Sequence, residues 1–341
     1  LYGEYSRAVR QIYAQYTDKI EPFGIDECWL DVTHSSIFGS GEEIAEKIRR
    51  QVKDTYGLTV SVGVSFNKIF AKLASDLKKP DAVTVVGRED YRQQIWPLPV
   101  SDLLFVGRAT AEKLKHFGIS TIGDLAAADR EMLAQGLGKW GVTLSAYARG
   151  EDDSPVRGED EQEDLKSVGN SLTYFEDITK PEDIKRLLYA LSESVAARIK
   201  DAGLGKADTV HLWVRDCDLG NHSWQRKVRP TALCGEIAEA AFALYTERYR
   251  AGKPVRGLGV TASGFDGGVE QLSFDSFGGD YEKKARAEEA VGKIRQKYGY
   301  AKIQRGIMFE DARVLGMDVR GQRLKRPAGG QENTKKDDTD E

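Results

Sequence analysis

The chain has 341 residues, of which 40% are hydrophobic and 30% charged, and its formal net charge is −4. This is the composition of a globular protein with two or three domains, and it excludes a global positive field of the kind that predicts nucleic-acid binding. No apolar run approaches the roughly 20 residues of a membrane span, no signal segment opens the chain, and three widely spaced cysteines exclude a disulfide framework or a zinc site. We therefore expect a monomeric, cytoplasmic protein without a membrane partner, whose cysteines are reduced core residues.

The first 96 residues contain predicted helices and strands in alternation. Apolar residues recur at three- and four-residue spacing in the helical segments, and alternate with polar residues in the strands. Gly57 marks the end of the second helix. This alternation up to Trp96 indicates an α/β unit. The predicted order is a helix over residues 2–16, an extended segment over 20–33, a helix over 41–56, a strand over 58–66, a short helix over 67–77 and a strand over 81–87.

Residues 97–150 are predicted to be helical, with turns that contain glycine. The stretch DLLFVGRATAEKLKHFGISTIGDLAAA places a glycine-containing hairpin between two short helices, and GLGKWGVTLSAYARG looks like a looser second copy. Residues 151–165 then contain eight acidic residues against one basic residue. We interpret this segment as a solvated linker between domains.

Residues 166–265 predict the order β-α-β-β-α-β, which is a split βαβ domain. Because side chains alternate between the two faces of a strand, one face of this sheet is basic and exposed, as a phosphate backbone would require. Residues 266–317 include an amphipathic helix over 280–298, and residues 318–341 are expected to be disordered. The residues assigned to the exposed face are His211, Trp213 and Arg215 on one strand, and Gln225, Lys227 and Arg229 on the next.

Two adjacent carboxylates, Asp26 and Glu27, interrupt the extended apolar stretch EPFGIDECWLDVT. In a regular strand their side chains point to opposite faces, so both reach one metal ion only if the strand bends or ends there. Alternatively, one faces solvent and the other caps a turn. Because the neighbouring residues predict a largely buried strand, where an unpaired carboxylate costs several kcal/mol, we favour a divalent cation such as Mg²⁺. Asp31 is expected to make a local structural hydrogen bond.

Two long motifs resemble those of the Y-family translesion DNA polymerases of the DNA polymerase IV type. GIDECWLDVT is similar to the palm motif SIDEAYLDVT of that family, and SVGVSFNKIFAKLASDLKKP resembles its second palm motif. The resemblance extends in the same order over residues 1–310 and implies an α+β fold. The implied domains are a partial palm over 1–96, a helix-hairpin-helix thumb over 97–150, the acidic linker over 151–165 and a split β-α-β-β-α-β little finger over 166–265.

The resemblance also implies the chemistry, a two-metal nucleotidyl transfer that uses two Mg²⁺ ions, primer-template DNA and a dNTP. Asp26 then corresponds to the aspartate that bridges both ions. Glu27 corresponds to the catalytic glutamate, also at the metal site, beside the primer 3′ hydroxyl. Lys79 matches the lysine that holds the incoming triphosphate, and Pro80 disfavours helix at Lys79, which helps to free its side chain.

The stretch VGRATAEKLKHFGI resembles the family's helix-hairpin-helix, which binds duplex phosphates through backbone N–H groups and carries no base specificity. Phe105 stands where the family has a first glycine, which argues against close backbone approach at that point. The candidate DNA contacts in this hairpin are Gly107, Arg108, Thr110 and Lys113. Those expected from the little finger are Lys166, Ser167, Arg215, Lys227, Arg229 and Arg256.

The stretch EQLSFDSF resembles the short Gln-Leu-x-Leu-Phe peptide by which bacterial polymerases dock on the sliding clamp. Gln271, Leu272 and Phe274 would be its anchors. Phe274 replaces the usual second Leu, and Asp275 replaces the usual Phe, so this chain departs from the pattern at two positions.

One part of the family's palm has no counterpart here. The first palm strand of the family carries another metal-binding aspartate followed by an aromatic steric gate, and no such segment occurs in the 341 residues. We therefore expect a fragment that does not extend a primer by itself. Two other interpretations stay open: a non-catalytic DNA- and clamp-binding protein that kept the fold, and a UmuC-like relative that needs partner subunits.

Overall fold

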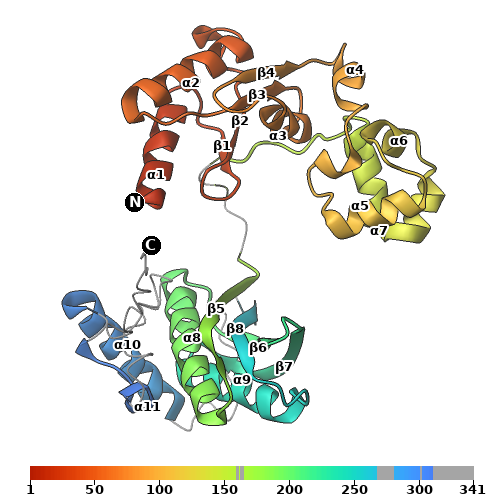
Figure 1. Cartoon of the computed structure of the whole chain (residues 1–341). Helices are drawn as coiled ribbons and strands as arrows, with labels where there is room; N and C mark the ends of the chain where they lie inside the picture. The colour runs from red at the N-terminus through yellow and green to blue at the C-terminus, as the bar shows by residue number, and fades with distance from the viewer. Residues whose placement is uncertain (159–160, 162–164, 267–279, 300–301, 310–341) are drawn as a thin grey trace, which may run out of the picture. The chain divides into compact units, whose positions relative to one another are not determined.

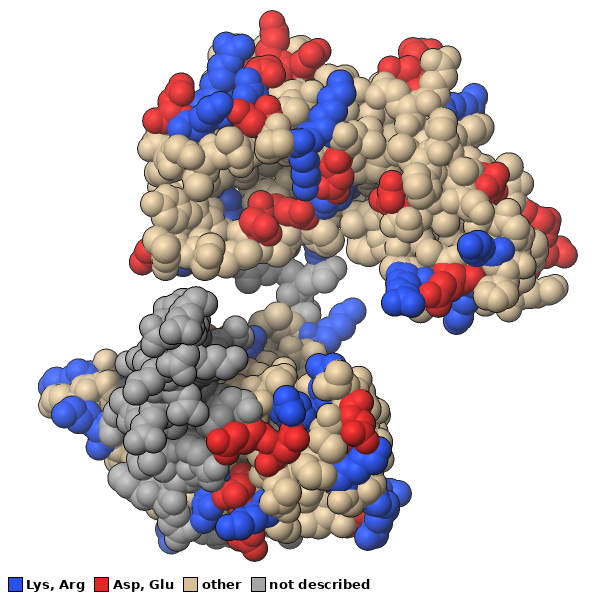
Figure 2. Space-filling model, in the orientation of Figure 1, with Lys and Arg blue, Asp and Glu red and all other residues tan. Residues whose placement is uncertain are grey.

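The computed structural model describes residues 1–158, 161, 165–266, 280–299 and 302–309. These residues form two compact units, Leu1–Glu163 and Asp164–Glu341, which are described separately (Figure 1). On the face shown in Figure 2, basic and acidic side chains lie interspersed on both units, as the small net charge would suggest. Within the described residues, no helix combines the length and apolar character needed to cross a membrane.

Unit 1 begins with helix α1 (Tyr2–Tyr13) and a small antiparallel pair, β1 (Ile20–Pro22) and β2 (Cys28–Leu30). Helix α2 (Gly41–Tyr56) starts in a capping box at Ser40 and ends at Gly57, which has a positive φ of 66°, as the sequence predicts. The parallel pair β3 (Val62–Ser65) and β4 (Val83–Val86) is connected by helix α3 (Lys68–Leu77). The predicted helix–strand order is confirmed with two exceptions: the first helix ends three residues early, and the single extended segment expected over 20–33 is two antiparallel strands joined by a turn.

Helix α3 is held tightly on the parallel strands. Asn67 caps its start, because its side chain accepts a 2.8 Å hydrogen bond from the N–H of Phe70. A Cβ atom at Gly63 of β3 would lie 1.9 Å from the carbonyl oxygen of Ala71, so only glycine allows this approach. The orientation of α3 relative to the strands is therefore fixed by close backbone packing.

The remainder of unit 1 is helical. It contains α4 (Tyr91–Ile95), α5 (Arg108–His116), α6 (Ile122–Ala127) and α7 (Arg130–Ala148). At the expected second hairpin copy, α7 consists of two helical stretches separated at Gly138, whose φ of +67° is not helical. One hydrophobic core joins these helices to α3: its buried residues include Ile69, Phe70, Leu73, Leu114, Ile122, Leu125, Leu133 and Leu144.

Unit 2 is a four-stranded antiparallel sheet with the order β5-β8-β6-β7, covered on one face by two helices. The elements are β5 (Ser167–Ile178), α8 (Pro181–Asp201), β6 (Ala207–Asp216), β7 (Asn221–Thr231), α9 (Cys234–Arg248) and β8 (Val255–Phe265). Since β8 lies between β5 and β6, the predicted split βαβ arrangement is confirmed. Figure 1 shows α8 between the sheet and helix α10 (Asp280–Tyr298).

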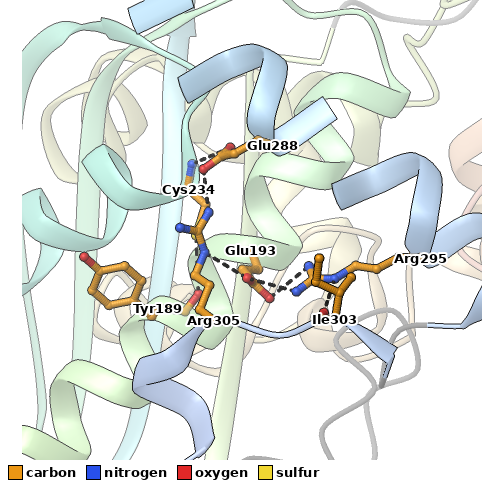
Figure 3. Close-up of polar contacts among 7 residues, drawn as sticks. All are labelled: Tyr189, Glu193, Cys234, Glu288, Arg295, Ile303 and Arg305. Carbon is orange, nitrogen blue, oxygen red and sulfur yellow. Dashed lines mark hydrogen bonds and ion pairs between the residues drawn. The ribbon is translucent and has the colours of Figure 1, made fainter. Parts of the chain in front are cut away.

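Helix α10 and the short helix α11 (Gly306–Phe309) are attached to α8 through one buried carboxylate. The side chain of Glu193 is 5% exposed and forms ion pairs with Arg295 at 3.2 Å and Arg305 at 2.9 Å. Figure 3 shows Glu193 between the two guanidinium groups. Arg305 also pairs with Glu288, which accepts a hydrogen bond from the N–H of Cys234.

The three cysteines are free thiols, as expected, but only one belongs to the core. Cys234 is buried, and its burial raises the pKa of its thiol. Cys28 and Cys217 are half-buried, so the expectation of three core cysteines is wrong for these two. Cys28 lies in a short strand pair, and Cys217 follows the end of β6.

Candidate active site and nucleic-acid interface

The adjacent carboxylates Asp26 and Glu27 lie in a turn between β1 and β2. The strands pair Ile20 with Leu30 and Pro22 with Cys28, and the turn closes with a 2.9 Å hydrogen bond from the N–H of Phe23 to the carbonyl oxygen of Glu27. The extended stretch therefore ends at the carboxylates, which is the condition that metal sharing requires.

The burial predicted for this stretch is wrong. Asp26 is exposed, and the side chain of Glu27 is 37% exposed. Ile25, expected in a buried strand, is 55% exposed. A three-residue strand with a turn encloses little, so solvation alone makes the two carboxylates tolerable, and the desolvation argument for a cation does not apply. The expected local bond of Asp31 is confirmed, since its carboxylate accepts a 3.0 Å hydrogen bond from the N–H of Thr33.

The carboxylate that is buried beside this turn is Glu21, on β1. It is 7% exposed and accepts hydrogen bonds from the Nζ of Lys68 at 2.7 and 2.8 Å. Arg157 donates to it through its backbone N–H at 2.9 Å and its guanidinium at 3.2 Å. Burial alone would raise the pKa of Glu21, but these hydrogen bonds outweigh it and lower the pKa. Residues 151–158, expected to be a solvated linker, are therefore anchored to unit 1 at Arg157.

Lys68 also attaches strand β2 to the start of α3. Its ammonium lies 4.7 Å from the centre of the Trp29 ring, and its carbonyl oxygen accepts a 2.9 Å hydrogen bond from the indole N–H. The hairpin is thus fixed from both strands, by Glu21 on β1 and by Trp29 on β2. Sequence reasoning overlooked both contacts, because the partners are distant in the chain.

Glu27 and Lys79 belong to one network of charges along α3. Lys72 lies 3.3 Å from Glu27 and 2.6 Å from Asp76, and Asp76 lies 2.6 Å from the Nζ of Lys79. Partial burial lowers the pKa of Lys72, but the two carboxylates outweigh this effect and raise it, so Lys72 remains charged. The spacing of Lys68, Lys72 and Asp76, four residues apart, is a sequence signal for this face of the helix that went unused.

The hairpin residues fit a hard divalent cation. Mg²⁺ is held in proteins by one or two carboxylates and completes its shell with water and phosphate oxygens, and Asp26 offers an exposed carboxylate beside that of Glu27. Within the described residues, no group of three or more His, Cys, Asp or Glu side chains is arranged to hold an ion. Asp26 and Glu27 could therefore supply only some of the ligands of such an ion, and other oxygen ligands would have to complete its shell.

In the helical part of unit 1, Gly107 is the residue that precedes α5. The space beside Gly107 is open, since a Cβ atom there would have no neighbour within 4 Å. No side chain makes a capping hydrogen bond at the start of the helix. The first N–H groups of α5 are therefore available to an anion. Of the other candidates, Lys113 is exposed, Thr110 is half-buried, and Arg108 is 93% exposed with its Nε 3.0 Å from Glu112.

Phe105 keeps the backbone conformation for which glycine is favoured. Its φ is +72°, in the left-handed region. Its ring is 46% exposed and contacts Phe23 of the hairpin turn and Trp140 and Tyr147 of α7, with ring centres 6.4, 5.8 and 6.3 Å away. Phe at this position therefore leaves the turn before α5 in place. Its ring also connects that turn to the acidic turn, residues 23–27 between β1 and β2, through the contact with Phe23.

The uncovered face of the sheet in unit 2 carries the residues that alternate counting predicts. Lys227 and Arg229 are exposed, and Arg215 is half-buried with an Nε that has no hydrogen-bond partner among the described residues. Lys227 pairs with Asp208, and Arg256 pairs with Asp177, each at 2.5 Å. Lys166 and Ser167 are exposed at the start of β5. The clamp-peptide residues Gln271, Leu272 and Phe274 lie outside the described residues.

Three family models match the chain. Residues 1–76 match the impB/mucB/samB family, residues 165–274 match the C-terminal domain of that family, and residues 88–119 match its HHH motif. The solved structure of a Y-family DNA polymerase chimera is 25% identical, with a TM-score of 0.66, over 78% of this chain and 76% of that one. An insertion ternary complex of Dbh DNA polymerase, 23% identical with a TM-score of 0.51, shares the fold.

These matches define the class as a Y-family DNA polymerase fold. Among curated proteins, the DNA polymerase IV of Acetivibrio thermocellus is 44% identical over 91% of this chain and 79% of its own length. The DNA polymerase IV of Clostridium kluyveri is 36% identical over 92% of this chain and 80% of its own length. The chain belongs to the impB/mucB/samB family of Y-family DNA polymerases, and its relatives are DNA polymerases IV.

Proposed function

We propose that the chain takes part in translesion DNA synthesis, as a DNA-directed DNA polymerase that uses two Mg²⁺ ions. The observation that carries this proposal is the acidic turn, with Asp26 and Glu27 exposed beside the charge network that ends at Lys79. Polymerase IV relatives with 44% and 36% identity support the reaction type.

In this proposal Asp26 and Glu27 would hold the two ions, and Glu27 would lie beside the primer 3′ hydroxyl. The bound ions would supply Lewis acidity for that hydroxyl and positive charge for the triphosphate and the leaving pyrophosphate. The Glu27 carboxylate is oriented by Lys72, which in turn is held by Asp76. These contacts keep the carboxylate in place before substrate arrives, which lowers the reorganisation that the reaction requires.

Lys79 is proposed to bind the incoming triphosphate. It is 54% exposed, and its ion pair with Asp76 is of the exposed type, which contributes about 0–1 kcal/mol. Exchange of this partner for a triphosphate therefore costs little. The ammonium gains a more highly charged partner, while Lys72 still neutralises Asp76.

The proposal for catalysis is tested in a chimera in which this chain replaces the matching residues of the Acetivibrio thermocellus DNA polymerase IV. Primer extension is measured at a single turnover with Mg²⁺ and dNTPs. Asp26→Ala is expected to lower the rate by about a thousandfold or more, since the ions contribute several kcal/mol to the reaction, while primer-template affinity stays within about threefold. Asp18→Ala, at another acidic position of unit 1, is the control.

An equal loss of DNA affinity in Asp26→Ala would point to a structural role for this carboxylate. Full activity of Asp26→Ala would exclude Asp26 from the metal site. A chimera that binds primer-template DNA but extends no primer before any substitution would support the alternative, a non-catalytic DNA- and clamp-binding protein with the same fold. A non-catalytic binding protein would not require the network of Glu27, Lys72, Asp76 and Lys79. We therefore favour the polymerase over this alternative.

The DNA-binding part of the proposal rests on the N–H groups at the start of α5 and on the exposed sheet face of unit 2. Both contact phosphates without reading bases, so affinity should fall steeply with salt. Replacing Lys227 and Arg229 together by Ala should lower the slope of log K against log salt by about 2, one for each lost phosphate contact. An unchanged slope would exclude this face.

Sliding-clamp docking through EQLSFDSF is a separate proposal, supported by the sequence motif alone. A synthetic peptide of residues 268–279 should bind a bacterial clamp weakly, and the Gln271→Ala peptide should not. Equal binding of the two peptides would exclude the motif as the anchor.

A further inference from the structure

Trp213 lies on the uncovered face of the sheet in unit 2, in a row of small residues. Strand register aligns Ser171, Gly259, Trp213 and Ser223 across the four strands. The neighbouring rows consist of Gly169, Thr261, His211 and Gln225, and of Thr173, Gly257, Arg215 and Asn221. Most of these side chains are small, so the indole of Trp213 is the largest group at its level of the sheet.

The Trp213 ring lies over two glycines of β8. A Cβ atom at Gly257 would be 3.1 Å from Cη2 of the indole, and one at Gly259 would be 3.2 Å from Cε3. The indole N–H donates to the Oδ1 of Asn221 at 3.2 Å, which fixes the orientation of the ring in its own plane. One face of the indole is thus covered by the sheet, and the ring is held before any ligand arrives.

A depression of about 520 Å³ opens beside this ring. Its lining includes Ser171, His211, Trp213, Gly259 and Thr261. The depression therefore combines an aromatic surface with hydroxyl and imidazole groups that can form hydrogen bonds at its edge. This is the chemistry that recognises a flat, polar-edged ring.

Basic side chains lie on the same face of the sheet as the depression. Arg215 lies two residues from Trp213 on the same face, with its Nε unpaired among the described residues, and exposed Lys227 and Arg229 lie along β7. A ligand with a flat ring and a linked negative charge would fit both the indole surface and the basic side chains. Base rings on a phosphate backbone meet this description, and aromatic side chains beside basic grooves bind single strands in this way.

We propose that this depression is a stacking subsite for an unpaired DNA base, with the indole of Trp213 as its platform. A paired base is already stacked on its neighbours and presents only its edges, so the subsite selects bases that have left the duplex. The inference rests on the proposed function, because it assumes that the basic sheet face contacts DNA.

The test compares single-stranded and duplex oligonucleotides by fluorescence anisotropy with the purified chain. Trp213→Ala is expected to weaken single-strand binding about tenfold, the size of one lost base–aromatic contact, and to change duplex binding less than twofold. Trp213→Phe, which keeps a ring, should retain most of the affinity. Ser223→Ala, directly across from Trp213 on β7, is the matched control and should match the wild type.

Abasic oligonucleotides separate stacking from phosphate contact. The wild type should bind an abasic single strand about tenfold more weakly than the normal strand, and Trp213→Ala should bind the two equally. Equal losses of Trp213→Ala on single strands and duplex, or equal affinities of the Phe and Ala variants, would overturn the subsite. Melting temperatures of the variants identify any that fail to fold. If Trp213→Ala fails to fold, the comparison of Trp213→Phe with the wild type tests the subsite instead.

The same experiments separate this inference from the proposed function. If the Lys227→Ala, Arg229→Ala double variant loses affinity for all DNA while Trp213→Ala binds like the wild type, the sheet face contacts DNA and the subsite is excluded. If neither change affects any DNA, the sheet is not the interface and both proposals for it are wrong.

Discussion

In each unit a buried glutamate lies between two basic residues, and the two arrangements hold different segments. In unit 1, Glu21 binds Lys68 and Arg157 and so positions the hairpin that carries Asp26 and Glu27. In unit 2, Glu193 binds Arg295 and Arg305 and so attaches α10 and α11 to α8 (Figure 3). Glu21 therefore holds the hairpin of the candidate active site, whereas Glu193 holds the two additional helices, α10 and α11, against α8.

The difference shows what each surface depends on. The acidic turn lies on three-residue strands, which have little core of their own, so its position depends on polar contacts with α3. The exposed sheet face depends on the register of four long strands, whose other face packs on α8 and α9 in a large core. We therefore expect loss of Glu21 to disturb function and loss of Glu193 to leave DNA binding intact.

The largest effect in this comparison is expected for the two alanine substitutions. Glu21→Ala and Glu193→Ala each remove a buried carboxylate that two basic groups bind, and removal of one member of a buried pair costs about 3–5 kcal/mol. In the chimera, Glu21→Ala should also lower the primer-extension rate at temperatures where the protein is folded. Glu193→Ala should bind single strands and duplex as the wild type does.

Urea unfolding followed by tryptophan fluorescence measures these losses separately. In a Trp213→Phe, Trp224→Phe background the remaining tryptophans all belong to unit 1 and report Glu21→Ala. In the reverse background, with Phe at positions 29, 96 and 140, Trp213 and Trp224 of unit 2 report Glu193→Ala. Glu89→Ala, at an exposed position, is the control. A normal extension rate for Glu21→Ala would show that the hairpin holds its position without this carboxylate.

A smaller effect is expected from acid. Because Lys68 and Arg157 lower the pKa of Glu21 below 4.5, its contribution to stability is present above about pH 4.5 and is lost as the pH falls through the lower, folded-state pKa. Glu21→Gln should therefore show a weaker decline in unfolding free energy of unit 1 between pH 5 and pH 3 than the wild type. Parallel declines would mean that other carboxylates dominate. Glu89→Gln should follow the wild type.

The sequence predicted the elements better than it predicted the environment of the site. Periodicity located α2, α3 and all the strands of unit 2, because these elements bury one regular face. It failed at the acidic turn, where exposed Ile25 was interpreted as part of a buried strand. Apolar composition does not reveal that a strand is only three residues long, since that depends on distant partners such as Arg157.

The resemblance proposes Asp26, Glu27 and Lys79 as site residues, but it does not indicate the neighbours that contact Glu27 and Lys79. Lys72 and Asp76 lie inside the second motif, and their four-residue spacing indicates a shared helix face. The contact of Glu27 with this helix face depends on tertiary structure, so no local sequence pattern predicts it. On the sheet of unit 2, by contrast, alternate counting was enough, because both strands are long and regular.

The smallest effect concerns two residues with positive φ, Phe105 in unit 1 and Leu219 in unit 2. A non-glycine residue in this region is strained by roughly 1–2 kcal/mol, so glycine should be more stable than alanine at both positions, by about 1 kcal/mol. Phe105→Ala should cost more than Leu219→Ala, because the ring of Phe105 also contacts Phe23, Trp140 and Tyr147. Urea unfolding of the four variants measures both differences. If alanine proved equal to glycine at position 105, the turn would leave the left-handed region without its ring, and the aromatic contacts would be what holds it there.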